Sequence, residues 1–131
     1  MSAALSALGP LLGRLLLVAI FGYSGWLKLV APGHAAAVIS GHGLPFATYG
    51  ARGVGVFELA LALLIALGLK VRPAALAGFA YLVLVTWLVH WHPAMHGDRL
   101  QMIQVLKNAG LGGGMLLLAA HGPGSFSVDR G

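Results

Sequence analysis

Four long apolar segments dominate this chain and limit what it can fold into. They cover approximately residues 11–30, 47–69, 73–90 and 101–120. A helix of about 20 apolar residues spans the roughly 30 Å hydrocarbon core of a bilayer. The sequence therefore predicts an all-α integral membrane four-helix bundle, with residues 1–131 forming a single transmembrane domain.

The low content of charged residues supports a membrane location. Only 8% of the residues are charged and 59% are hydrophobic, whereas about 25% of residues are charged in soluble domains. Eight basic and three acidic side chains cannot cover the surface of a water-soluble protein of this size. The chain also has 20 glycines, and small residues let membrane helices approach closely. The lipid bilayer is therefore its first expected partner.

The charge balance and the absence of cysteine exclude other classes of protein. The net charge of +5 is interpreted as lysine and arginine anchoring helix ends at anionic lipid. We expect no nucleic-acid partner, because the sequence has neither a basic cluster nor a soluble module. The absence of cysteine excludes thiol redox chemistry and cysteine-bound iron–sulfur clusters within the chain.

The connections between the segments define two faces of the predicted bundle. Gly68, followed by Lys70 and then Pro73, predicts a helix end, a tight basic turn and a new helix. This turn shares one face, the A face, with both termini. Residues 31–46 and 91–99 lie at the opposite B face. The first of these connections predicts a short interfacial helix between spans 1 and 2.

The distribution of basic residues leaves the orientation in the membrane open. A bias of lysine and arginine toward one face normally marks the cytoplasmic side. Here the two faces have equal numbers: Arg14, Lys70, Arg72 and Arg130 toward the A face, and Lys28, Arg52, Arg99 and Lys107 toward the B face. Arg14 and Arg52 are interpreted as interface anchors.

Two opposite charges fall inside the predicted spans. By the helical rise, Glu58 lies roughly 15 Å and Lys107 roughly 9 Å from the B face. Each costs free energy in hydrocarbon unless it is paired or hydrated, so we expect the two to pair across helices. Such a pair is compatible either with a packing clamp or with a polar pocket open to the B face.

Further polar residues gather in the same half of the bundle. Ser24 and Lys28 are one turn apart in the first span, and His90 lies at the end of the third. In the fourth span Gln104 and Asn108 belong to one polar stripe. For Lys28, an extended side chain reaching the interface stays an alternative. The candidate ligand-binding residues are Ser24, Lys28, Glu58, His90, Gln104, Lys107 and Asn108.

Three histidines near the B face form a weak metal-binding pattern. His90, His92 and His96 give the spacing H-x-H-x3-H, and histidine is a common metal ligand. The alternative is a set of interfacial histidines beside the belt tryptophans Trp87 and Trp91. We favour that alternative and expect no metal, with the three histidines as the candidate ligands if one binds.

An ordered set of motifs resembles the DoxX family of small four-span membrane proteins. The resemblance covers residues 10–130 and rests on several stretches: Arg14-Leu15-Leu16-Leu17 and Ser24-Gly25-Trp26-Leu27-Lys28 in the first span, Glu58-Leu59 in the second, and Gln101 through Asn108 in the fourth. The histidine-rich B face, with His92 and His96, departs from common family members.

The resemblance implies a location and a set of functions. It implies a bacterial inner membrane protein with both termini cytoplasmic. Family members are similar to a small subunit of an archaeal thiosulfate:quinone oxidoreductase. The chain would then be a membrane subunit of a redox-linked complex, binding a quinone or a small polar ligand beside a partner redox subunit or further copies of itself. No covalently bound cofactor is implied, and whether the chain is itself an enzyme stays open.

A quinone site would need an apolar slot with hydrogen-bond donors at the carbonyl groups. Lys107 or His90 could donate, Glu58 could relay protons, and aromatic walls could come from Trp26, Trp87 or Tyr81. Two alternatives remain: a non-catalytic anchor or assembly subunit, and a histidine-lined conduit for metal or solute.

Overall fold

The computed structural model describes residues 2–129, and these residues form helices without any strand. Four of the helical stretches are long and apolar enough to cross a membrane, which confirms the predicted all-α membrane bundle. The helices are α1 (Ala3–Val30), α2 (Gly33–Gly41), α3 (Ala47–Leu67), α4 (Val71–Val85), the π-helical segment η1 (Thr86–Trp91), α5 (His92–Met95) and α6 (Arg99–His121).

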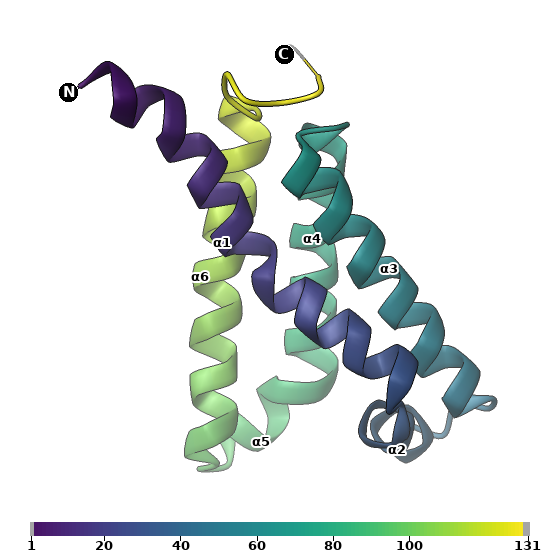
Figure 1. Ribbon diagram of the computed structural model, residues 1–131. Helices are drawn as coiled ribbons and strands as arrows, with labels where there is room; N and C mark the ends of the chain where they lie inside the picture. Colours follow the sequence, from purple (N-terminus) through teal and green to yellow (C-terminus); the bar gives the residue numbers. More distant parts are fainter. Residues whose placement is uncertain (1, 130–131) are drawn as a thin grey trace.

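The chain ends and connections lie on the two predicted faces (Figure 1). The start of α1, the tail after α6 and the turn between α3 and α4 lie at one end of the bundle, whereas α2 and α5 lie at the other. The A and B faces of the sequence therefore correspond to these two ends. Helix α2 confirms the short helix expected between spans 1 and 2. Arg130, counted at the A face, lies outside the described residues.

Two membrane helices extend five or more residues beyond an end of the apolar segments that predicted them. Helix α1 continues through Pro10 and begins at Ala3, where the Ser2 hydroxyl accepts a hydrogen bond from the backbone N–H of Leu5. The third span does not end at His90, because η1 and α5 continue it to Met95. A π-helical segment inside a helix often marks a functional site.

Helices α1 and α3 meet where two glycines face each other. A Cβ atom on Gly25 would lie 2.8 Å from the carbonyl oxygen of Gly55, and a Cβ on Gly55 would lie 2.8 Å from that of Gly25. Side chains larger than hydrogen would therefore push the two backbones apart. This close approach sets the spacing between α1 and α3. Each helix carries a charged residue three positions after its glycine, Lys28 on α1 and Glu58 on α3.

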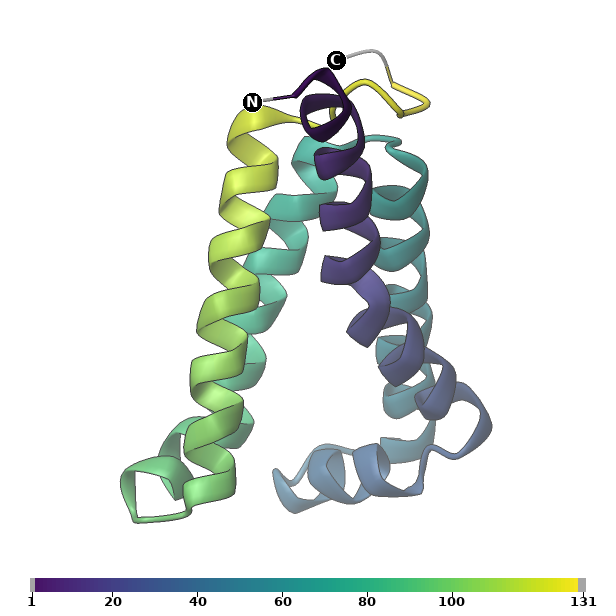
Figure 2. The same ribbon diagram turned by 60° about the vertical axis from the view of Figure 1, so that its left-hand side comes forward.

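The bundle consists of two helix pairs that diverge toward the B face (Figure 2). Helix α1 packs along α3, and α4 packs along α6, while α1 and α6 make few contacts with each other. The apolar core, which includes Phe21, Ile65 and Met115, joins the pairs nearer the A face. The divergence leaves room between the pairs at the B end.

The C-terminal tail closes the A face, and Arg14 holds it. Val128 and Asp129 donate backbone hydrogen bonds to the carbonyl groups of Leu67 and Gly68, each at 3.0 Å. Arg14 is 2% exposed, and its Nη2 donates to the carbonyl oxygen of Phe126. The interpretation of Arg14 as an interface anchor was therefore wrong, because the guanidinium points into the protein and binds the tail.

A candidate ligand pocket at the B face

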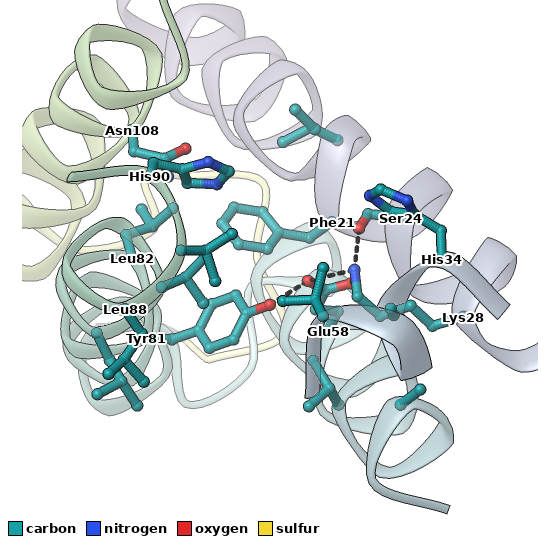
Figure 3. A pocket seen from close by; sticks show the side chains of 18 of the residues that line it. Phe21, Ser24, Lys28, His34, Glu58, Tyr81, Leu82, Leu88, His90 and Asn108 are labelled. Atoms are coloured by element: carbon teal, nitrogen blue, oxygen red, sulfur yellow. Dashed lines mark hydrogen bonds and ion pairs between the residues drawn. The ribbon is translucent and has the colours of Figure 1, made fainter. Parts of the chain in front are cut away.

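A cavity of about 370 Å³ lies between the two helix pairs at the B end. Its polar lining comes from all four spans, and Figure 3 shows most of these side chains turned toward one another. Apolar side chains from α1, α3, α4, η1 and α2 make up most of its wall. Of the seven predicted site residues, six line this pocket: Ser24, Lys28, Glu58, His90, Lys107 and Asn108.

Glu58 pairs with Lys28 and not, as expected, with Lys107. The Nζ atom of Lys28 lies 3.0 Å from Glu58 Oε2 and 3.2 Å from Oε1, and it donates to the Ser24 hydroxyl at 2.5 Å. The Glu58 side chain is buried. The predicted pairing was wrong because depth along each helix does not determine which neighbour is nearest. The contact of Gly25 with Gly55 brings α1, and not α6, against α3.

Tyr81 completes the hydrogen bonding of the buried carboxylate. Its hydroxyl on α4 donates to Glu58 Oε1, so one carboxylate links three helices. The rings of Phe57 and Phe21 pack against the Tyr81 ring, with centroids 5.2 Å and 6.3 Å away. The sequence suggested Tyr81 only as an aromatic wall. A hydrogen bond from Tyr81 could have been predicted from the sequence, because a phenol inside an apolar span usually has a hydrogen-bond partner.

His90 lies in η1 and is oriented by the fourth span. Its Nδ1 lies 2.5 Å from the amide oxygen Oε1 of Gln101. Since an amide oxygen only accepts, we assign the hydrogen to Nδ1. Neutral His90 then keeps Nε2 as an acceptor, and protonated His90 gains a second donor. The residue can therefore offer either kind of hydrogen bond to a ligand.

Helix α6 places one cation and one amide on the pocket, and each of them has a polar side chain as its partner. Lys107 donates to the amide oxygen of Gln104, which does not itself line the cavity. Asn108 is buried and donates through Nδ2 to the Thr86 hydroxyl of η1 at 3.0 Å. The polar stripe predicted on this helix thus divides into residues that line the pocket and residues that orient them.

Helix α2 lies across the B end of the cavity, and His42 connects it to the third span. His34, Val38 and other α2 side chains line the pocket. The Nδ1 of His42 lies 2.8 Å from the Val38 carbonyl oxygen, and Nε2 lies 2.9 Å from that of Leu88. The hydrogen bond to Val38 and then the one to Leu88 raise the pKa of His42 above its ordinary value. Both nitrogens face acceptors, so the protonated ring fits best.

The three aromatic side chains proposed as pocket walls differ in position. Tyr81 lines the cavity, whereas Trp26 is exposed on α1 and does not line it. Trp87 stacks on Trp91, with ring centroids 6.2 Å apart, beside a second hollow between α4, η1 and α6. Phe21, which the sequence did not single out, lines the pocket beside Tyr81. The aromatic wall therefore comes from α1 and α4.

The histidines of the B face do not converge on a common point. His92 and His96 stack with ring centroids 4.1 Å apart, while His90 turns to Gln101. Within residues 2–129, no group of three histidine, aspartate or glutamate side chains is placed to hold a metal ion. The three candidate ligands are therefore not assembled into one site.

Comparisons with known proteins agree with this architecture. The family model described as DoxX matches residues 9–91. "Inner membrane protein YphA" of Escherichia coli (strain K12) is 33% identical over 122 residues, which cover 92% of this chain and 87% of that protein. "Inner membrane protein YqjF" of the same organism is 29% identical over 126 residues, 96% of this chain and 93% of its own. No solved structure matches the chain. The chain belongs to the DoxX family.

Proposed function

We propose that this chain is a small membrane subunit of a redox-linked complex and binds a ligand with a polar headgroup and an apolar body. The observation that carries this proposal is the pocket itself, in which an apolar wall surrounds convergent polar groups from four helices. Ligand sites in proteins commonly have this combination. A purely structural polar cluster would not need a cavity of about 370 Å³ beside it.

A quinone is the first ligand to test, because the family resemblance includes a subunit of a quinone oxidoreductase. Lys107 and His90 are the candidate donors to its carbonyl oxygens. Glu58, hydrogen-bonded by Tyr81, is the candidate proton relay. The chain has no cysteine, so a cysteine-bound cluster would come from a partner subunit.

The names of the two relatives place them in the inner membrane of a bacterium. We place this chain in the same kind of membrane, with both termini on the cytoplasmic side. A fluorescent protein fused to the C-terminus should then fluoresce in cells, and an alkaline phosphatase fused there should be inactive. The opposite pattern would reverse the orientation and put the pocket on the cytoplasmic side.

The test of ligand binding uses two valines on α3. Val54 lines the pocket, whereas Val56 is exposed on the outer surface and lines neither hollow. The wild-type protein and the variants Val54→Trp and Val56→Trp are purified in native nanodiscs, and the bound quinone is measured by mass spectrometry. We expect quinone with wild type and Val56→Trp, and at least about tenfold less with Val54→Trp. Equal amounts in all three would exclude the pocket as the site.

One observation favours the anchor subunit as the second candidate. Glu58 already has partners in Lys28 and Tyr81, so the centre of the cluster is satisfied without a ligand. An anchor subunit would be stable and would co-purify with a partner subunit, while no small molecule is enriched over protein-free nanodiscs. Purified protein that contains only homo-oligomers and no bound ligand would contradict membership of a redox complex.

A further inference from the structure

The three carboxylate side chains of this protein are all accounted for in the structure. Glu58 pairs with Lys28. Asp98 caps α6, where its Oδ1 accepts a hydrogen bond from the backbone N–H of Gln101 at 3.1 Å. Asp129 accepts one from the backbone N–H of Lys70 at 2.5 Å, at the A face. The sequence has no other aspartate or glutamate, and Asp98 stands nine residues before Lys107, at the start of α6. Among the described residues, Glu58 is therefore the one side-chain carboxylate that lines the pocket.

Lys107 is a second cation on the pocket: it is partly exposed, and it contributes to the lining of the cavity. It lies eight residues after Arg99, the first residue of α6, which is roughly 12 Å along the helix. Within residues 2–129 its side-chain hydrogen bond goes to the neutral amide of Gln104. A lysine inside a membrane span costs free energy unless it is paired or hydrated. The pocket therefore contains two lysines and one carboxylate, which leaves one positive charge unmatched.

The other polar groups on the cavity cannot supply the missing negative charge. Ser24 and Tyr81 are hydroxyls that already bond to Lys28 and Glu58, respectively. Asn108 is a neutral amide, and His34 and His90 are neutral or positive. None of these side chains supplies a negative charge, and Asn108 and the histidines can each donate a hydrogen bond to an anion.

We infer that the ligand of this pocket is an amphiphile with an anionic headgroup, a carboxylate or a phosphate, whose charge is met by Lys107. The inference rests on the proposed binding function and adds the charge of the ligand. A neutral quinone leaves Lys107 unmatched, so a quinone satisfies the pocket fully only in a reduced, ionised form.

The wall of the cavity explains why the anion carries an apolar body. Ile20, Val38, Val54, Leu82 and Leu88 are among the side chains that surround the polar groups. A bare ion would leave these surfaces in contact with water, whereas an alkyl chain buries them at roughly 25 cal/mol per Å². The headgroup would lie beside Lys107 and His90, and the chain would lie between the helix pairs.

The test compares ligands that differ only in the headgroup. Equilibrium binding of radiolabelled decanoate, decyl phosphate and decanol is measured to protein in phosphatidylcholine nanodiscs, with protein-free nanodiscs subtracted. Lys107→Gln removes the charge and Lys107→Arg keeps it. Arg99→Gln is the matched control: Arg99 is a cation on the same helix, at the B face of the bundle, and it does not line the pocket. Unlabelled inorganic phosphate is added as a competitor.

We expect decanoate and decyl phosphate to bind about ten- to a hundredfold more tightly than decanol, since hydrogen bonds to charged groups are the strong ones. Lys107→Gln should abolish the difference, while Lys107→Arg and Arg99→Gln retain it. Competition by inorganic phosphate would show that a soluble anion is sufficient to occupy the site. Binding that inorganic phosphate does not reduce would show that the site requires an amphiphile. Equal affinity for decanol and decanoate, or binding of neutral quinone without either anion, would overturn the anionic headgroup and leave the binding function intact. Failure of every ligand, quinone included, would overturn both.

Discussion

The Nζ atom of Lys28 lies 3.0 Å from Glu58 Oε2, inside the membrane half that faces α2. Glu58 is 3% exposed, and Lys28 and Tyr81 both donate hydrogen bonds to its carboxylate. A buried ion pair adds little net stability, but removing one partner strands the other charge. The pair therefore fixes the arrangement of α1, α3 and α4 around the pocket.

Loss of Lys28 should destabilise the protein more than loss of Lys107. Lys28→Met strands the Glu58 carboxylate and should lower the free energy of unfolding by about 3 kcal/mol. Lys107→Met removes a cation that bonds to a neutral amide and should cost less than about 1 kcal/mol. Thermal unfolding in detergent measures both. The double variant Lys28→Met with Glu58→Gln should recover most of the loss. Equal losses for the two single variants would mean that the ion pair is not the stabilising contact.

The close approach of α1 and α3 gives a second prediction. Gly55→Ala puts a methyl group against the Gly25 carbonyl oxygen and the Lys28 Cβ, and should cost about 1–3 kcal/mol. The matched control is Gly53→Ala on the same helix, where nothing lies within 4 Å of the added atom. It should change stability by less than about 1 kcal/mol in either direction. Identical melting temperatures for the two variants would contradict the glycine contact.

The buried Arg14 should control access to the C-terminal tail. Its guanidinium donates to the Phe126 carbonyl oxygen, and a hydrogen bond to a charged group contributes about 1.5–3 kcal/mol. Chymotrypsin cleavage after Phe126, followed by mass spectrometry, should therefore be about tenfold faster in Arg14→Met than in wild type. Arg52→Met, which removes an exposed cation of α3, should leave the rate unchanged. Unchanged cleavage in Arg14→Met would show that the tail is held by its backbone contacts alone.

The spans were predictable from the sequence, but the side chains that meet were predicted only in part. Hydropathy and the glycine and proline at the turn after α3 determine the four spans and the two faces. Depth along separate helices also grouped six pocket residues correctly. It could not identify the partner of Glu58, because the rotation of each helix and the Gly25–Gly55 contact decide which lysine is nearest.

Arg14 shows a different limit of sequence reasoning. Its acceptor, the Phe126 carbonyl, is a backbone atom 112 residues away in the sequence. Any residue could supply such an acceptor, so no pattern of side chains indicates the contact. An arginine near a helix end was therefore interpreted as a lipid anchor, although the folded tail covers it.

The bridge made by His42 should depend on pH. Hydrogen bonds to the Val38 and Leu88 carbonyls raise the pKa of His42 above the ordinary value of about 6.5. A raised pKa in the folded state means that the contribution is fully present below about pH 6.5 and is lost as the pH rises through the raised value. The neutral ring keeps one N–H and so loses one of its two hydrogen bonds, and α2 should therefore be held less firmly against η1 above the raised pKa than below it.

Spin labels can measure this loosening. The chain has no cysteine of its own, so two cysteines introduced at Ser40 and Met95 would carry the labels. Their distance distribution, from double electron–electron resonance, should be narrow at about pH 5.5 and broaden by about pH 8.5. In His42→Ala it should be broad at both. A pH response of the same size in His42→Ala would assign the titration to another group.

A crystal structure of the protein grown from a lipid mesophase tests the central claim, the ligand pocket, most directly. We predict elongated non-protein density among Glu58, His90 and Lys107, with its polar end at Lys107 and its body between the two helix pairs. The density should persist in Val56→Trp and be absent from Val54→Trp, in which the indole fills the cavity. A well-ordered wild-type pocket that contains only water, or that is closed by contact of α1 with α6, would contradict the claim.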